Sequence, residues 1–138
     1  MYLSISIGGN EKMGVWVGYN DRMIWSPSLK TGHLFAAEIK ALEQTVGQRS
    51  GISTTMSDTL EIDPPAFAAF IQAVLGLLEE TNSGPLLAMT AGCLEVAIAL
   101  NAKITGQWPE VSEPLQPLVR RARTVMAALP KRAVAVHA

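Results

Sequence analysis

Glu95 is the side chain in this sequence best placed for acid–base chemistry, because it is the one carboxylate inside a long apolar stretch, residues 85–105. A carboxylate removed from water can serve as a general acid or base near neutral pH. At about 100° per residue, the helical face around it otherwise carries small side chains: Ala88, Ala91, Gly92, Ala99 and Ala102. Three interpretations stay open: a tight helix crossing in which Glu95 pairs with an arginine, a backbone group or water, a hydrophobic pocket floored by Ala91 and Gly92, or a dimer contact.

The histidines and the cysteine offer little further chemistry. His33 lies in the first turn of a predicted helix and is a secondary catalytic candidate, whereas His137 is near the chain end and is discounted. No two candidate ligands have metal-site spacing, and one cysteine and two histidines come close to excluding a structural zinc site, so we assign no metal and no cofactor. Gly8-Gly9 precedes a turn rather than a helix, which excludes a phosphate-binding glycine loop there.

Two other groups of residues are binding candidates. Asp58 and Glu61 lie close to Asp63, which is explained as a helix cap. The first two form a solvated loop or contact a basic protein partner or cation. The three tryptophans pack between sheet and helices, or they line a ligand pocket or anchor an interface: Trp16, Trp25 and Trp108.

Composition indicates one soluble domain that associates with itself. The chain has 138 residues and a net charge of −1, which gives no reason to expect a nucleic-acid partner. Charged residues make up 17% and hydrophobic residues 49%, so we expect a homo-oligomer that hides part of the surface. Cys93 is the single cysteine, which excludes an intrachain disulfide. With no signal peptide at the start, the sequence predicts a cytoplasmic protein.

Alternating apolar residues predict strands in the N-terminal part. Residues 2–7, 14–19 and 22–25 are expected to form an antiparallel meander, with Asn20-Asp21 as a compact turn and the glycines of the second strand marking a bulge. Residues 48–55 are polar and predict a loop, and residues 56–62 predict a short strand or an extended segment.

Helical spacing of apolar residues predicts four helices. The first begins at Leu29 or Thr31 and ends near Gly47, and the second begins after Asp63 with Pro64 in its first turn. The third is the buried helix 85–105, and the fourth runs from about residue 114 to 129. The expected fold is therefore α+β, with an N-terminal antiparallel β-meander packed on a bundle of about four helices. Residues 1–130 form one domain and 131–138 a loose tail.

The stretch 85–105 is nearly long enough to cross a membrane, since about 20 apolar residues span a bilayer. A carboxylate at the centre of a lone span costs about 2.5–3.5 kcal/mol or more. Asn101 and Lys103 also interrupt its end. We therefore expect a buried core helix and no membrane partner.

A series of short motifs follows in order between residues 22 and 105: Ile24-Trp25-Ser26-Pro27-Ser28, Leu34-Phe35, Asp58, Glu61-Ile62-Asp63-Pro64, and Phe67 with Phe70. In this order they resemble a group of small actinobacterial proteins of unknown function. The resemblance implies a bacterial cytoplasmic protein encoded beside accessory genes, such as natural-product or toxin–immunity clusters. It implies no catalytic residue.

Two functions follow as hypotheses. The first is a non-catalytic binding or interaction protein, immunity-like or accessory, that acts as a homo-oligomer on a protein partner. The second is a small enzyme of secondary metabolism, a cyclase or isomerase, with Glu95 as acid or base in a hydrophobic pocket that takes a small hydrophobic ligand.

Overall fold

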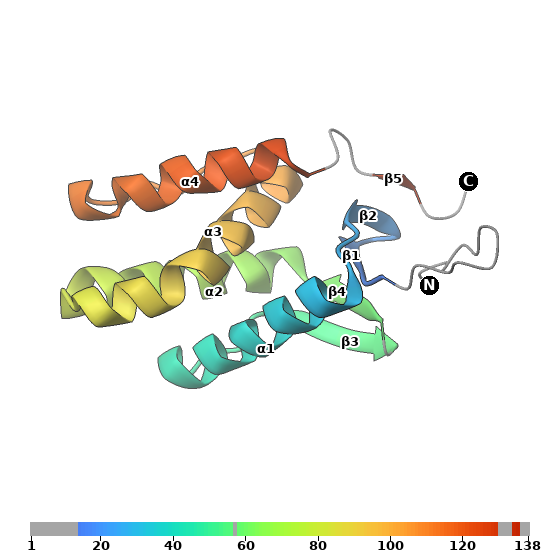
Figure 1. The fold of residues 1–138 in the computed structure, drawn as a ribbon, viewed down its shortest axis with the longest axis horizontal. Helices are drawn as coiled ribbons and strands as arrows, with labels where there is room; N and C mark the ends of the chain where they lie inside the picture. Colours follow the sequence, from blue (N-terminus) through green and yellow to red (C-terminus); the bar gives the residue numbers. More distant parts are fainter. Residues whose placement is uncertain (1–13, 57, 130–133, 136–138) are drawn as a thin grey trace.

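One five-stranded sheet, in the order β3-β4-β1-β2-β5, covers one end of four helices. The computed structural model describes residues 14–56, 58–129 and 134–135 (Figure 1). Its strands are β1 (Trp16–Tyr19), β2 (Arg22–Trp25), β3 (Ile52–Met56), β4 (Thr59–Ile62) and β5 (Val134–Ala135). Its helices are α1 (Leu29–Val46), α2 (Pro64–Thr81), α3 (Gly84–Thr105) and α4 (Gln116–Ala127), with a 3₁₀ turn, η1 (Glu113–Leu115), leading into α4. The α+β class is confirmed.

The predicted hairpin of β1 and β2 is present, and its turn is the one expected. Asn20 and Asp21 both have positive φ angles, 48° and 60°. A two-residue turn needs this conformation at both positions for its twist to match that of the flanking strands. The register shifts between Val17 and Gly18, which places an irregularity in the glycine-bearing strand as predicted.

The sheet is mixed rather than purely antiparallel, which corrects the expected meander. β1 pairs with β4 in parallel, through Val17 opposite Leu60, whereas β3 and β4 form a second antiparallel hairpin. A parallel pair needs a long connection, and α1 supplies part of it. The predicted loop 48–55 is wrong in its second half, because Ile52 and the following residues form β3.

A short segment near the C-terminal end contributes to the sheet in a way that the sequence did not predict. We expected a loose tail over residues 131–138, but Val134 and Ala135 pair with Met23 and Arg22 of β2. The predicted strand 2–7 and His137 lie outside the described residues.

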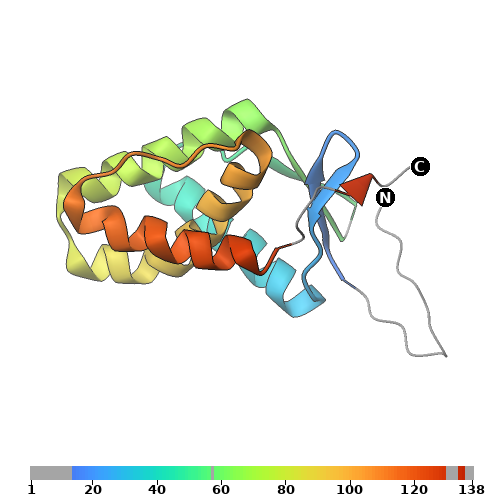
Figure 2. The ribbon, with the colours of Figure 1, turned by 90° about the horizontal axis from the view of Figure 1, so that it is seen from above.

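The first three helices begin and end where local chemistry predicted, whereas α4 is two residues shorter at each end than the predicted helix 114–129. Ser28 caps α1 by accepting a hydrogen bond from the Thr31 N–H at 3.3 Å, and Gly47 ends α1 with a φ of 69°. Asp63 is the N-cap of α2, although its side chain makes no capping hydrogen bond. The helices lie on one side of the sheet (Figure 2), and the core between them includes Val17, Leu60, Phe67, Phe70, Leu94 and Ile98.

The two halves of α3 lie in different surroundings. Cys93, Leu94 and residues 97–100 are buried, chiefly against α4 and α2. The first turns keep an exposed side that includes Ala88, Met89 and Gly92. By length and composition α3 could cross a membrane, but its buried residues pack in the core as those of a soluble protein's central helix do.

Candidate functional site

Glu95, the first candidate, is engaged by an arginine from the next helix. Arg121 on α4 donates from Nε to the Glu95 carboxylate at 2.5 Å, and the Glu95 side chain is 14% exposed. Ala99 and Ala102 on α3 and Ala122 on α4 are buried, so small side chains allow the two helices to lie close together. Of the three arrangements open from the sequence, the structure shows the pairing at a helix crossing.

The small residues beside Glu95 do not enclose a hollow. Ala91 is half-buried, and Gly92 is exposed. A Cβ added at Gly92 would meet nothing within 4 Å. This part of α3 therefore presents a bare, open stripe rather than the floor of a closed pocket.

His33 and Asp58, predicted in separate roles, lie next to each other. The Nε2 atom of His33 is 3.7 Å from Oδ1 of Asp58, and the two side chains are 61% and 23% exposed. The backbone carbonyl of Asp58 also accepts a hydrogen bond of 2.8 Å from the Trp16 N–H, which fixes the β3–β4 turn beside β1. Among the described residues, no nucleophilic side chain is recorded in contact with the pair. The pair connects α1 to the turn between β3 and β4.

The acidic candidates do not assemble a cation site. Glu61 lies on β4, half-buried and opposite Ser53 of β3. Within residues 14–56, 58–129 and 134–135, no group of three potential metal-ligating side chains comes together.

The tryptophans lie in three different surroundings. Trp25 packs edge-on against Phe35 of α1 at 5.5 Å between ring centres. Trp16 is buried, and its indole Nε1 has no hydrogen-bond partner among the described residues. The guanidinium of Arg123 lies over the Trp108 ring at 4.4 Å, a cation–π contact between α4 and the segment after α3.

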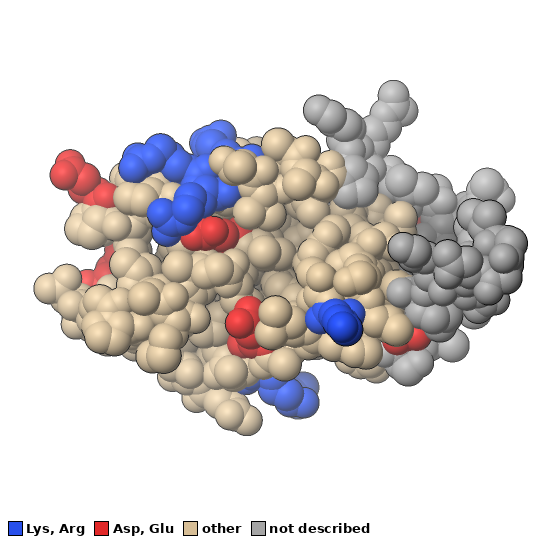
Figure 3. Space-filling view, in the orientation of Figure 1, with Lys and Arg blue, Asp and Glu red and all other residues tan. Residues whose placement is uncertain are grey.

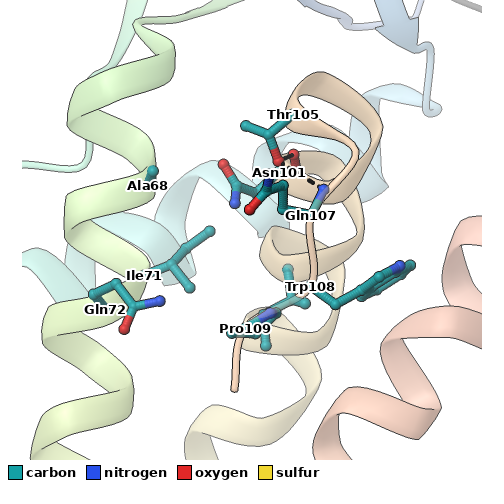
Figure 4. A pocket seen from close by; sticks show the side chains of 9 residues that line it. Ala68, Ile71, Gln72, Asn101, Thr105, Gln107, Trp108 and Pro109 are labelled. Atoms are coloured by element: carbon teal, nitrogen blue, oxygen red, sulfur yellow. Dashed lines mark hydrogen bonds between the residues drawn. The ribbon is translucent and has the colours of Figure 1, made fainter. Parts of the chain in front are cut away.

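A hollow of about 350 Å³ opens between α2, the end of α3 and residues 107–109 (Figure 4). Its apolar wall is formed by Ala68, Ile71, Ile98, Trp108 and Pro109. Its polar groups are the side chains of Gln72, Asn101, Thr105 and Gln107. Of this lining, Trp108 was the one residue predicted from the sequence. The amide side chains on otherwise apolar helices were the available clue, but their convergence depends on how the helices pack.

A second, more apolar groove of about 290 Å³ runs between α1 and the first half of α3. It is lined by Glu38, Ala41, Leu42, Thr45, Leu86, Met89, Thr90 and Cys93. Burial and then the negative charge of Glu38 raise the pKa of the Cys93 thiol to about 12. Cys93 is thus a protonated, unreactive thiol at neutral pH.

The chain matches a family described as a family of unknown function (DUF6086) over residues 13–131. No curated protein and no solved structure matches it. The resemblance to a family of unknown function is confirmed and extends beyond residues 22–105 in both directions, whereas an actinobacterial origin stays a prediction. The chain therefore belongs to the family of unknown function DUF6086.

Proposed function

We propose that the protein is a non-catalytic binding protein that acts as a homodimer, joined through the groove between α1 and α3. The observation that carries the proposal is the exposure of two large apolar side chains. Leu34 on α1 is 60% exposed, and Met89 in the groove wall is 75% exposed. Leu34 is outside the groove lining but lies on α1 one turn before Glu38, which belongs to it, so both exposed side chains are carried by the helices that form the groove. Exposed apolar side chains beside an apolar groove favour an interaction site there.

A second copy of the chain suits this face because opposite charges border it. Glu38 of α1 lies at one side, and α4, which carries Arg120, Arg121 and Arg123, lies beyond α3 at the other. Figure 3 shows basic side chains gathered over α4 on this face. A two-fold axis through α3 would bring the acidic side of each copy to the basic side of the other.

The pairing of Glu95 and the composition of the chain also favour a binding protein. Glu95 is held by Arg121, which suits a structural carboxylate better than a general acid or base facing substrate. A charged fraction of 17% leaves a monomer with much apolar surface to cover. We place the protein in the bacterial cytoplasm, where a lone free thiol is stable, as an accessory or immunity-like factor that works by contact with a protein.

The test is the mass of the protein in solution, by native mass spectrometry and light scattering at micromolar concentration. A dimer, twice 14.8 kDa, is expected. Leu34→Glu combined with Met89→Glu should give a folded monomer, because each contact would then bury an unpaired charge. Gln44→Glu with Thr81→Glu, at exposed positions outside the groove lining, should leave the dimer intact.

Charge reversal tests the orientation of the two copies. Glu38→Arg would place like charges together and should weaken the dimer about tenfold at low salt. Glu80→Arg on α2 makes the same charge change away from the groove and should have no effect. A monomeric parent protein, or a Leu34/Met89 double variant that stays dimeric, refutes the proposal.

A further inference from the structure

We propose that the outer edge of β3 binds an extended segment of a partner protein, which joins the sheet as a further strand beside α1. This role rests on the proposed function, since it assumes a protein partner, and it gives that partner's chemistry. Figure 1 shows β3 at the edge of the sheet, with α1 running alongside. The groove beside this edge shares no lining residue with the groove assigned to the dimer, so both can be occupied at once.

The main-chain groups of β3 point alternately towards β4 and away from it. The Asp63 N–H bonds to the Gly51 carbonyl at 2.8 Å, so these two residues form a hydrogen-bonded pair of the β3–β4 ladder. Such pairs alternate with non-bonded pairs along an antiparallel ladder. Ser53 is therefore bonded to β4, whereas the N–H and C=O groups of Ile52 and Thr54 point to the outer edge.

That outer edge is open to another strand. The Ile52 N–H donates to Ser50 Oγ at 3.2 Å, which leaves the Thr54 N–H and the carbonyls of Ile52 and Thr54 without a strand partner among the described residues. Thr54 is exposed. β3 also carries no charged residue and no proline, which many edge strands use to block pairing. Because the register shifts after Thr54, we expect regular pairing over residues 52–54.

A groove of about 220 Å³ lies beside this edge, between α1 and β3. Ile52 and Thr54 line it from β3, since alternate residues of a strand face the same side, and Leu60 lines it from β4. The small side chains of Ala36 and Ala37 line it from α1. Strand addition takes its affinity from main-chain hydrogen bonds and its specificity from pockets for alternate side chains. A partner segment with an apolar side chain at every second position therefore fits.

The charged residues of the groove favour an acidic partner. One carboxylate oxygen of Glu43 is already bonded, by the Ser50 N–H at 2.9 Å and the Ser50 hydroxyl at 2.6 Å. Lys40 is exposed in the lining and forms no ion pair with a described residue. A carboxylate of the partner would complement Lys40. The bonds of Ser50 also hold the start of β3 on α1, so this edge loses little ordering entropy when it binds.

The test is amide hydrogen exchange of the full chain, measured by NMR, with the capped peptide acetyl-Asp-Val-Thr-Val-Thr-Val-Asp-amide as the probe. The Thr54 amide faces solvent in the free protein and should exchange fast. At about 90% occupancy by the probe its exchange should slow about tenfold, because it then exchanges from the free fraction. The Ser53 amide, already bonded to β4, is the internal reference and should change little.

Modified probes test the main-chain pairing and the charge. Neighbouring residues of a strand direct their N–H groups to opposite edges, so the probe pairs through one set of alternate residues. Of two probes, one N-methylated at its valines and one at its threonines, one should lose binding and the other should keep it. A probe with lysine in place of both aspartates should bind about fivefold more weakly at low salt.

Variants of the protein locate the binding. Thr54→Pro removes the outward N–H at an edge position, where a strand tolerates proline, and should abolish binding. Thr54→Val keeps the N–H and should bind the probe as the parent protein does. Ala37→Leu fills the groove from α1 and should also abolish binding, whereas Ala69→Leu, exposed on α2, should not. If Thr54→Pro does not fold, the pair of leucine variants decides.

The proposal is overturned if the probe leaves Thr54 exchange unchanged, if the two methylated probes bind equally, or if Ala37→Leu binds the probe as well as Ala69→Leu. A parent dimer that becomes a monomer with Thr54→Pro would assign the edge to a second copy of the chain and would overturn it as well. The double variant Leu34→Glu with Met89→Glu should still bind the probe. The exchange of Thr54 and the mass of the dimer therefore report separately on this site and on the proposed function.

Discussion

Arg121 of α4 and Glu95 of α3 form a hydrogen-bonded ion pair whose carboxylate is largely withdrawn from water. The pair lies beside a crossing lined by alanines, and α3 and α4 pack against each other more extensively than any other two described elements. The pair therefore joins α3, which carries the predicted catalytic carboxylate, to α4, which carries three of the six arginines of the chain.

Breaking this pair should destabilise the fold measurably. In a double-mutant cycle of Glu95→Gln and Arg121→Gln, we expect a coupling free energy of about 1 kcal/mol, because one partner is shielded and the other is half-exposed. Urea unfolding followed by circular dichroism measures it. Arg120→Gln, an exposed neighbour, should change stability by less than about 0.5 kcal/mol. A coupling near zero would show that the pair is only a surface contact.

Gly32 is buried where α1 meets the segment before β1, and its lack of a side chain is required there. A Cβ at this position would lie 2.4 Å from Cγ2 of Val15. Gly32→Ala should therefore destabilise the protein by about 1–3 kcal/mol through overpacking.

Gly76 in α2 is the matched control, since a Cβ there meets nothing within 4 Å. Gly76→Ala should stabilise the protein by about 0.4–1 kcal/mol, because alanine restricts the unfolded chain and favours helix. Thermal unfolding of the two variants and of the parent protein measures both changes in stability. Equal effects of the two substitutions would contradict the close approach at Val15.

The raised pKa of Cys93 makes stability fall at alkaline pH. The folded protein keeps the thiol proton to about pH 12, whereas the unfolded chain loses it near 9.0. The contribution of the Cys93 thiol to the free energy of unfolding is therefore complete below pH 9. It is lost as the pH rises from 9 towards 12, at up to about 1.4 kcal/mol per pH unit.

Urea unfolding of the parent protein and of Cys93→Ala at pH 8 and pH 10.5 isolates this effect from other titrating groups. The difference in unfolding free energy between the two proteins should shrink at the higher pH. The thiol should also react with an alkylating reagent at pH 8 only after denaturation. Rapid alkylation of the folded protein would rule out the buried, protonated thiol.

Ser50 connects the end of α1 to the start of β3 through hydrogen bonds with Glu43 and Ile52. One carboxylate oxygen of Glu43 accepts from the Ser50 N–H at 2.9 Å and from its hydroxyl at 2.6 Å, and the Ile52 N–H donates to Ser50 Oγ at 3.2 Å. Ser50→Ala should cost about 1–3 kcal/mol, since it leaves buried groups unpaired. Ser53→Ala, exposed on β3, should cost less than about 0.5 kcal/mol in the same unfolding assay.

The features that the sequence predicted correctly have local causes. Gly47 ends α1 in the left-handed conformation, Pro64 starts α2, and Asn20-Asp21 closes the first hairpin. Each depends on the residue itself and its immediate neighbours, so composition and spacing were sufficient.

The features that it missed depend on contacts between distant segments. β3 looked like a polar loop because Ser53 and Thr54 are exposed, and only the pairing with β4 reveals it as a strand. Arg121 could not be identified among the six arginines as the partner of Glu95 without knowing how α4 packs on α3. For the same reason the convergence of Asn101, Gln72 and Gln107 on one hollow was not predictable, since α2 and the end of α3 meet only in the folded chain.

The parallel contact of β1 with β4 also fixes an order of events during synthesis. The first hairpin leaves the ribosome with one side of β1 unpaired, and that side stays open until α1 and the second hairpin have followed. Such non-local pairing slows the search for the native state compared with a helical bundle of similar size. Nascent chains halted before β4 therefore carry an unprotected strand edge, a natural target for a chaperone.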